Sequence, residues 1–244
     1  MITSIMNQSK IVQAAFLLLA TTPAWSFSLE GGHVILQAGA FRSTQSQSQD
    51  IYIENLLGDR FTATRRHDSS GLFGLGYMLN GASYSAFDLA YGVNAFYLPK
   101  TSVQGTITQE FLYTNLAYRY GVSHVPIYAA VKATFNNQSD KYAWTVDAGV
   151  GPNFHMTTTY HDWSIDDGET YPDHAFLSHT RTTFSGMAGV GVRFNNVVGS
   201  VPLEIGYRFF YLGEGRLQPR TNQQLNTLKT GEAYANALVA TLII

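Results

Sequence analysis

Apolar side chains recur at every second position in five segments of this chain. The clearest is Pro202–Gly213, where Leu203, Ile205 and Phe209 alternate with Glu204 and Arg208. Successive side chains of a β-strand point to opposite faces, so each segment predicts a strand with one apolar face and one face of polar or small residues. The other four segments are Ala86–Leu98, Ile127–Phe135, Tyr142–Gly151 and Thr182–Asn195.

Five further segments alternate more weakly and fill most of the remaining chain: His33–Arg42, Leu72–Leu79, Glu110–Tyr120, Phe154–Trp163 and Ala233–Ile244. Each is near the roughly 9–11 residues that a tilted strand needs to cross a membrane. Proline removes a donor from a strand ladder, so we expect a turn at Gly151–Asn153 and about ten strands. If the segments on either side of Pro152 form one bent strand, the count becomes eight.

The N-terminal residues have the organisation of a secretory signal peptide. Lys10 precedes a short apolar run that ends before Pro23, and small residues follow. The run has about half of the roughly 20 apolar residues that a spanning helix needs. We therefore predict that residues 1–24 are a cleaved signal peptide and that residues 25–244 form one β-barrel domain.

Composition favours a membrane barrel over a secreted soluble one. Charged residues make up 13% of the chain and aromatic residues 14%, there are 22 glycines, and cysteine is absent. A soluble barrel should be charged opposite its apolar faces, whereas here those positions hold mostly Gly, Ala, Ser and Thr. A net charge of −2 gives no reason to expect a nucleic-acid partner.

The predicted connections alternate in length, as the turns and loops of bacterial membrane barrels do. The short ones are Asn80–Ala82, Gly121–Val125, Gly151–Asn153 and Asn195–Ser200. The long, polar ones are Ser43–Ser70, Pro99–Gln109, Ser164–Thr180 and Glu214–Gly231. Asn136–Lys141 would be a short outer loop and is the exception. Within the first long loop, Asp50–Asn55 and Arg60–Thr64 are expected to extend the first hairpin.

The glycine-rich segment Thr183–Gly213, together with Val146–Gly151, resembles the closing strands of opacity-protein-like outer membrane β-barrels. The resemblance covers about the last 100 residues. It implies an up-and-down antiparallel barrel in the bacterial outer membrane, surrounded by membrane lipids and lipopolysaccharide. We expect a monomer.

If the apolar faces point outward, several charged side chains enter the lumen. The acids are Asp88, Asp147 and Glu204, and the bases are Lys132, Arg193, Arg208 and Arg119. The interior of a barrel of eight to ten strands is about filled by its own side chains, and buried charges need partners. We therefore predict a structural ion network in a closed lumen; a narrow channel for small solutes is the alternative.

The loop from His161 to His174 combines carboxylates and imidazoles, which are possible ligands of a divalent cation. Its spacing matches no defined metal loop, so we predict no metal and no cofactor. A catalytic role for His161, Asp162 and His174 at the barrel rim is a third possibility, after the closed barrel and the channel. The leading interpretation is a protein that is not an enzyme and whose long loops contact host or envelope molecules.

Overall fold

A computed structural model describes residues 31–135, 141–198 and 201–244. The predicted signal peptide, residues 1–24, lies outside these ranges. From Gly32 to Ile244 the chain forms one compact unit. This part of the chain contains no helix that is long and apolar enough to cross a membrane.

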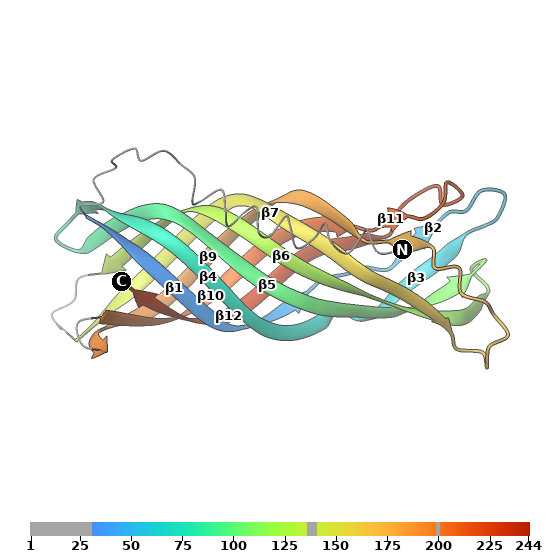
Figure 1. Cartoon of the computed structure of the whole chain (residues 1–244), viewed down its shortest axis with the longest axis horizontal. Coiled ribbons are helices and arrows are strands. Elements are labelled where there is room, and N and C mark those ends of the chain that lie inside the picture. Colours follow the sequence, from blue (N-terminus) through green and yellow to red (C-terminus); the bar gives the residue numbers. More distant parts are fainter. Residues whose placement is uncertain (1–30, 136–140, 199–200) are drawn as a thin grey trace, which may run out of the picture. The chain divides into compact units, whose positions relative to one another are not determined.

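Eight long antiparallel strands close into a barrel (Figure 1). Each strand pairs with its neighbours in the ring, and the last strand pairs with the first through Ile35 and Ile243. In ring order the strands are β1 (Gly32–Thr44), β4 (His67–Ser83), β5 (Phe87–Gln109), β6 (Tyr113–Phe135), β7 (Tyr142–Ser164), β9 (His179–Val198), β10 (Val201–Arg216) and β12 (Lys229–Ile243). The all-β barrel class is confirmed.

Four short strands lie within the long loops. β2 (Gln49–Ile51) pairs with β3 (Asp59–Arg65), which continues the sheet beside β5. This is the expected extension of the first hairpin. β8 (Phe176–Leu177) pairs with β11 (Gln218–Pro219) between two other loops. β2, β3 and β11 lie toward the same end of the barrel in Figure 1, and β8 is paired with β11.

The predicted count of ten strands is wrong, and the alternative of eight is found. The ten predicted segments are extended over most of their length, although Glu110–Leu112 forms a turn. Two pairs of segments merge into β6 and β7, which are 23 residues each. Pro126 of β6 lies directly opposite Asn153 of β7, one residue from Pro152, and the same register continues on both sides. The two prolines weaken the same stretch of ladder, so neither has to end its strand.

Three further predicted connections are also corrected. Asn80–Ala82 is part of β4, Pro99–Gln109 is part of β5, and Gly121–Val125 is part of β6. Residues 136–140 lie outside the described part of the chain. Phe135, the last described residue of β6, pairs with Phe87 and with Trp144, so β6 ends and β7 begins at the end of the barrel that has the Tyr84–Ala86 turn.

The side chains that face outward change character along the barrel. Toward the short-turn end they are apolar; Ile205 is 51% exposed, for example, while Arg208 on the opposite face is 3% exposed and buried. We call this surface the apolar band; it includes Leu36, Leu75, Val93, Val131, Val146, Val190, Ile205 and Leu238. In the outer membrane it faces lipid, and the short-turn end faces the periplasm.

Register shifts in β5, β6 and β7 mark where the strands leave this band. β5 and β6 shift between Leu98 and Thr101, and β6 and β7 shift between Arg119 and Gly121. Such bulges add a residue to one strand and re-aim the side chains that follow. Beyond them the strands continue as a second, extracellular half of the same barrel.

Candidate functional site: the barrel lumen and its outer rim

Four of the predicted lumen charges form one buried network. Lys132 Nζ lies 2.6 Å from Glu204 Oε2, and Arg208 Nη2 lies 2.7 Å from Asp147 Oδ2 and 3.5 Å from Glu204 Oε1. All four residues are between 2% and 7% exposed. A Cβ at Gly189 would come within 2.1 Å of Asp147 Oδ1 and 2.8 Å of Arg208 Cγ, so the glycine leaves the room in which this pair meets.

Two neutral residues complete the network. Gln37 Nε2 donates to Asn94 Oδ1 at 2.7 Å, and Arg208 Nη1 donates to Gln37 Oε1 at 2.5 Å. The alternation in Ala86–Leu98 already places Asn94 on the lumen face, but the sequence analysis missed Gln37. The feature that could have indicated Gln37 as a lumen residue is its single amide side chain between the apolar residues Leu36 and Ala38, in a weakly alternating segment.

The other three predicted residues do not join this network. Arg193 lies opposite Glu204 across the β9–β10 ladder, but its Nε is buried without a hydrogen-bond partner among the described residues. Asp88 is half-buried near the short-turn end and forms no ion pair with a described residue. The expectation for Arg119 is wrong: even-numbered residues of β6 point inward there, so Arg119 is exposed on the outer surface.

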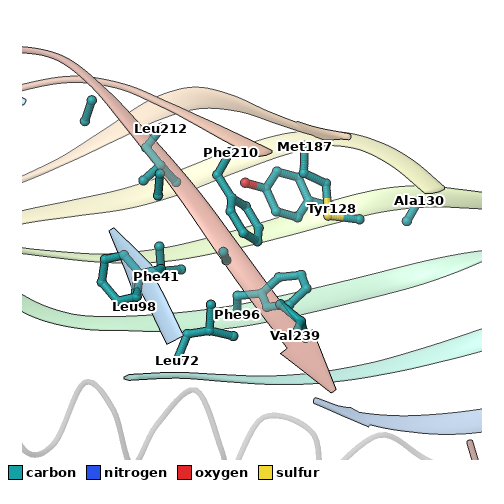
Figure 2. Packing of buried hydrophobic residues seen from close by; sticks show 13 residues of the cluster. Phe41, Leu72, Phe96, Leu98, Tyr128, Ala130, Met187, Phe210, Leu212 and Val239 are labelled. Atoms are coloured by element: carbon teal, nitrogen blue, oxygen red, sulfur yellow. The ribbon is translucent and has the colours of Figure 1, made fainter. Parts of the chain in front are cut away.

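An apolar cluster fills the lumen above the ion network (Figure 2). Phe210 lies at its centre, with its ring 5.2 Å from that of Phe96 and 6.3 Å from that of Tyr128. The cluster draws side chains from seven of the eight ring strands. Its members include Phe41, Leu72, Leu98, Met187, Leu212 and Val239. The members of this cluster are between 0% and 7% exposed.

A buried polar layer lies farther along the lumen. The rings of His124 and His155, opposite each other on β6 and β7, have centroids 4.4 Å apart. Asn153 Nδ2 donates to Leu212 O at 2.7 Å and lies 3.0 Å from His124 Nδ1. Because the bond to the Leu212 carbonyl identifies the NH₂ group of the Asn153 amide, this group also donates to His124 Nδ1. The proton of the neutral His124 ring is therefore on Nε2.

A second apolar cluster lies inside the extracellular half of the barrel. Tyr118, Tyr120 and Phe176 are each 1–2% exposed, and Phe61 packs against Tyr118 with ring centroids 5.2 Å apart. The remaining members are Ile51, Val103, Ile107, Leu116, Val122, Leu217 and Leu228. The lumen thus alternates ionic, apolar, polar and apolar layers from the short-turn end outward.

The outer rim contains an acid–imidazole pair. Asp162 is 1% exposed, and its Oδ1 lies 2.5 Å from Nδ1 of His174. The backbone N–H of His174 donates to Asp162 Oδ2 at 3.1 Å. The ring of His161 stacks on that of His174 with centroids 5.9 Å apart. The loop therefore brings together the three residues that the sequence singled out.

Carboxylates crowd around this pair. Burial raises the pKa of Asp173, and the charge of Asp162 adds to the effect. Burial also raises the pKa of Asp59, against the backbone N–H of Glu110 that donates to it. On the open side of the loop, hydrogen bonds from Ser164 and Thr170 lower the pKa of Asp166 to about 2. Within the described residues, no three His, Asp or Glu side chains are arranged to hold a metal ion.

No protein-family model matches this chain, and no curated protein matches it. Solved structures do. Neisserial surface protein A is 13% identical, with a TM-score of 0.41, and the match covers 88% of this chain and 98% of that one. The outer membrane protein OprG from Pseudomonas aeruginosa is 11% identical with a TM-score of 0.48, and the match covers 88% and 96% of the two chains.

The outer membrane protease OmpT from Escherichia coli is 9% identical with a TM-score of 0.44, and the match covers 87% of this chain and 95% of that one. These similarities concern the fold alone. Together, the closed ring of eight strands, the outward apolar band and the buried lumen charges identify the chain as a transmembrane β-barrel of the bacterial outer membrane, similar to opacity-protein-like barrels.

Proposed function

We propose that this protein is a closed, non-conducting barrel that presents a rigid outer rim to molecules outside the cell. The observation that carries the closed state is the continuous filling of the lumen. Ions would have to pass the Arg208 network and then the cluster around Phe210, both buried to a few per cent exposure. A conducting barrel needs a polar path of continuous water.

Single-channel recording in planar bilayers tests the closed state. The wild-type protein is expected to give no reproducible open level at moderate voltages. The matched variant is Phe210→Ala with Phe96→Ala, which removes the centre of the apolar plug and should increase open events. A stable open level in the wild type would contradict the closed lumen and favour the narrow-channel alternative.

Three outer loops are tied together at the rim, which supports a role in binding. Leu57 N donates to Glu110 Oε2 at 3.0 Å, joining the β2–β3 and β5–β6 hairpins. Leu225 N donates to Tyr52 O at 2.9 Å, joining the 217–228 loop to the same β2–β3 hairpin. Loops held in this way keep a defined surface, and a preorganised surface binds with less loss of entropy.

The tied loops expose large apolar side chains. Leu57, Leu112 and Tyr113 are 63–69% exposed, and Tyr52, Leu56 and Leu225 are exposed beside them. We call these six residues the apolar rim. Exposed apolar side chains that gather on one surface mark binding sites more often than scattered ones do.

A strained turn presents one end of this surface. Glu110 and Phe111 both have positive φ, 50° and 59°, and Leu112 N donates to Gln109 O at 2.9 Å. Two left-handed residues are what a type I′ turn requires, and glycine or asparagine normally occupies them. Retaining Glu and Phe there costs backbone strain, which is common where a loop is shaped for binding.

The charges of the rim define the partner. Its loops carry nine Asp and Glu residues, at 50, 54, 59, 110, 162, 166, 167, 169 and 173, against only Arg60 and Arg220. The complementary partner is a protein surface with apolar side chains flanked by Lys and Arg. Adhesion of cells that display the protein to surfaces coated with basic or acidic proteins tests this proposal. Leu57→Ser with Leu112→Ser should reduce adhesion to the basic coat alone.

The same proposal includes no catalytic activity. Asp162 and His174 form the base half of a possible catalytic group, but no hydroxyl nucleophile is hydrogen-bonded to His174 among the described residues. Incubation with peptide and lipid substrates is expected to show no turnover. Turnover that His174→Ala abolishes would replace the closed-barrel proposal with an enzyme.

A further inference from the structure

The balance of acidic and basic residues changes along the axis of the barrel. The lumen holds three acids and three bases, and the loops of the rim are acidic. Between the apolar band and the rim, the strands carry eight Lys and Arg residues against three Asp and Glu residues, a net charge of +5. We call the eight cations the basic collar: Arg42, Arg65, Arg66, Lys100, Arg119, Arg181, Arg216 and Lys229.

All eight collar residues are exposed. Among the described residues, Arg65 forms an ion pair with Asp68 and Lys229 with Glu214, each at 3.5 Å. Arg119, Arg181 and Arg216 have no carboxylate oxygen of a described residue within 4 Å, although Arg181 donates to the backbone carbonyl of Glu214. Exposed cations without a carboxylate partner raise the local potential, which an external anion would lower.

Two like charges are placed directly opposite each other in the collar. Arg216 on β10 is paired in register with Lys229 on β12, an arrangement that destabilises a ladder. Glu214 Oε1 lies 3.5 Å from Lys229 Nζ and offsets part of this repulsion, whereas Arg216 has no carboxylate of a described residue within 4 Å. On the other side of Arg216, a single hydroxyl ties its backbone to β9. Thr157 Oγ1 lies 3.1 Å from Arg216 O and 3.0 Å from His179 O. This brings the β9 end of the collar, with Arg181, close to Arg216.

The height of the collar identifies the anion. Directly below it, the outward side chains are aromatic: Tyr97, Phe154 and Phe184 are 40–65% exposed. Such rings lie at the boundary between hydrocarbon and headgroups. The collar therefore lies where the headgroups of the outer leaflet are, whereas the acidic rim lies beyond them.

We propose that the basic collar binds the phosphate groups of phosphorylated lipids in the outer leaflet. The lipid is recognised by its headgroup charge above and by the apolar band that takes its acyl chains below. Binding to the collar would orient the barrel vertically and keep the acidic rim away from the anionic surface. The proposal rests on the membrane placement of the barrel, and is independent of whether the lumen conducts.

Native mass spectrometry of the detergent-solubilised barrel, titrated with bisphosphorylated lipid A, tests the proposal. Each Lys or Arg near an anionic surface contributes enough that removing three is expected to weaken binding about 10- to 100-fold. The test variant is Arg119→Gln with Arg181→Gln and Arg216→Gln. The matched control, Arg60→Gln with Arg220→Gln, removes exposed cations from the rim and should bind as the wild type does.

Two further arms separate headgroup recognition from other causes. Dephosphorylated lipid A should bind the wild type as weakly as bisphosphorylated lipid A binds the triple variant, and millimolar inorganic phosphate should compete poorly because it lacks acyl chains. Equal binding of both lipids, or full binding by a triple variant whose circular dichroism shows a folded barrel, would overturn the proposal. Neither result would affect the conductance test, so the lipid-binding proposal and the closed-barrel proposal can be contradicted separately.

Discussion

The two halves of this barrel use the same strands in opposite environments. In the half near the short turns, β10 exposes Ile205 and buries Arg208. In the extracellular half, β6 exposes Arg119 and buries Tyr118 and Tyr120. One half is inverted relative to a soluble protein, and the other has the ordinary arrangement of a soluble barrel with an apolar core.

The difference shows that alternating apolar and polar residues predict the two faces of a strand but not whether lipid, water or the lumen lies against each face. The bulges near Pro99 and Tyr120 are where the outside changes from lipid to water. In the lower half the lumen combines the paired charges around Arg208 with the apolar cluster around Phe210, whereas the upper half depends mainly on apolar packing. The following predictions break or sharpen this contrast.

The largest effect is expected from Arg208→Ala in the lower half. Asp147 would lose its ion-pair partner among the described residues, and Gln37 would lose a donor, at a buried position. Removing one partner of a buried pair costs about 3–5 kcal/mol of unfolding free energy. Urea unfolding in phospholipid vesicles measures it.

The control for this variant is Arg60→Ala, because Arg60 forms an exposed ion pair with Asp50 on the rim. Its unfolding curve should stay near that of the wild type. If the two variants unfold alike, the buried network does not stabilise the lower half.

A smaller and more local effect is expected from Leu217→Ala in the upper half. Leu217 is 1% exposed inside the second apolar cluster, so the change leaves a cavity and costs about 2–3 kcal/mol. Hydrogen exchange should increase in β3 and the loops but not around Arg208. Leu238→Ala, on the lipid face of β12, is the comparison that should leave the extracellular half unchanged.

The rim should respond to pH through the carboxylates of Asp173 and Asp59. The pKa values of Asp173 and Asp59 are raised in the folded state, so the folded rim binds protons more readily than the unfolded chain does. Lowering the pH from 7.5 toward the ordinary carboxyl pKa of 3.8 should therefore make the rim loops more ordered, as followed by NMR.

Asp173→Asn should remove much of this dependence, and the exposed Asp167→Asn should not. The Asp166 carboxyl acts in the opposite direction, since its pKa is lowered to about 2. Its stabilising hydrogen bonds are complete above pH 3.8 and are lost only as the pH falls toward 2. A rim that loosens as the pH is lowered from 7.5 to 3.8 would contradict the assignment.

The smallest effect on folding is expected from Leu112→Ser. The side chain is 69% exposed at the rim, so the unfolding free energy should change by less than about 0.5 kcal/mol. The same change should reduce binding to a basic, apolar surface. A large loss of stability would mean that Leu112 is packed in the membrane-bound protein.

Much of the candidate site followed from local pattern. The lumen faces of Lys132, Asp147, Glu204 and Arg208 are set by alternation within each strand, and the structure places them inside. Their pairing could not be derived, because Lys132 meets Glu204 only through the register of strands 72 residues apart. Arg119 was misplaced because its own segment alternates weakly.

The sequence by itself determined that this chain is a membrane barrel, because side-chain direction in a strand is a local property with a period of two. Tertiary structure alone decided that the strands number eight and extend beyond the membrane. A glycine or proline ends a strand only if the hydrogen-bonded pairing with the neighbouring strand does not continue beyond it. Pro126 and Pro152 share one weak point in an otherwise unbroken register, and that neighbour relation is absent from either segment alone.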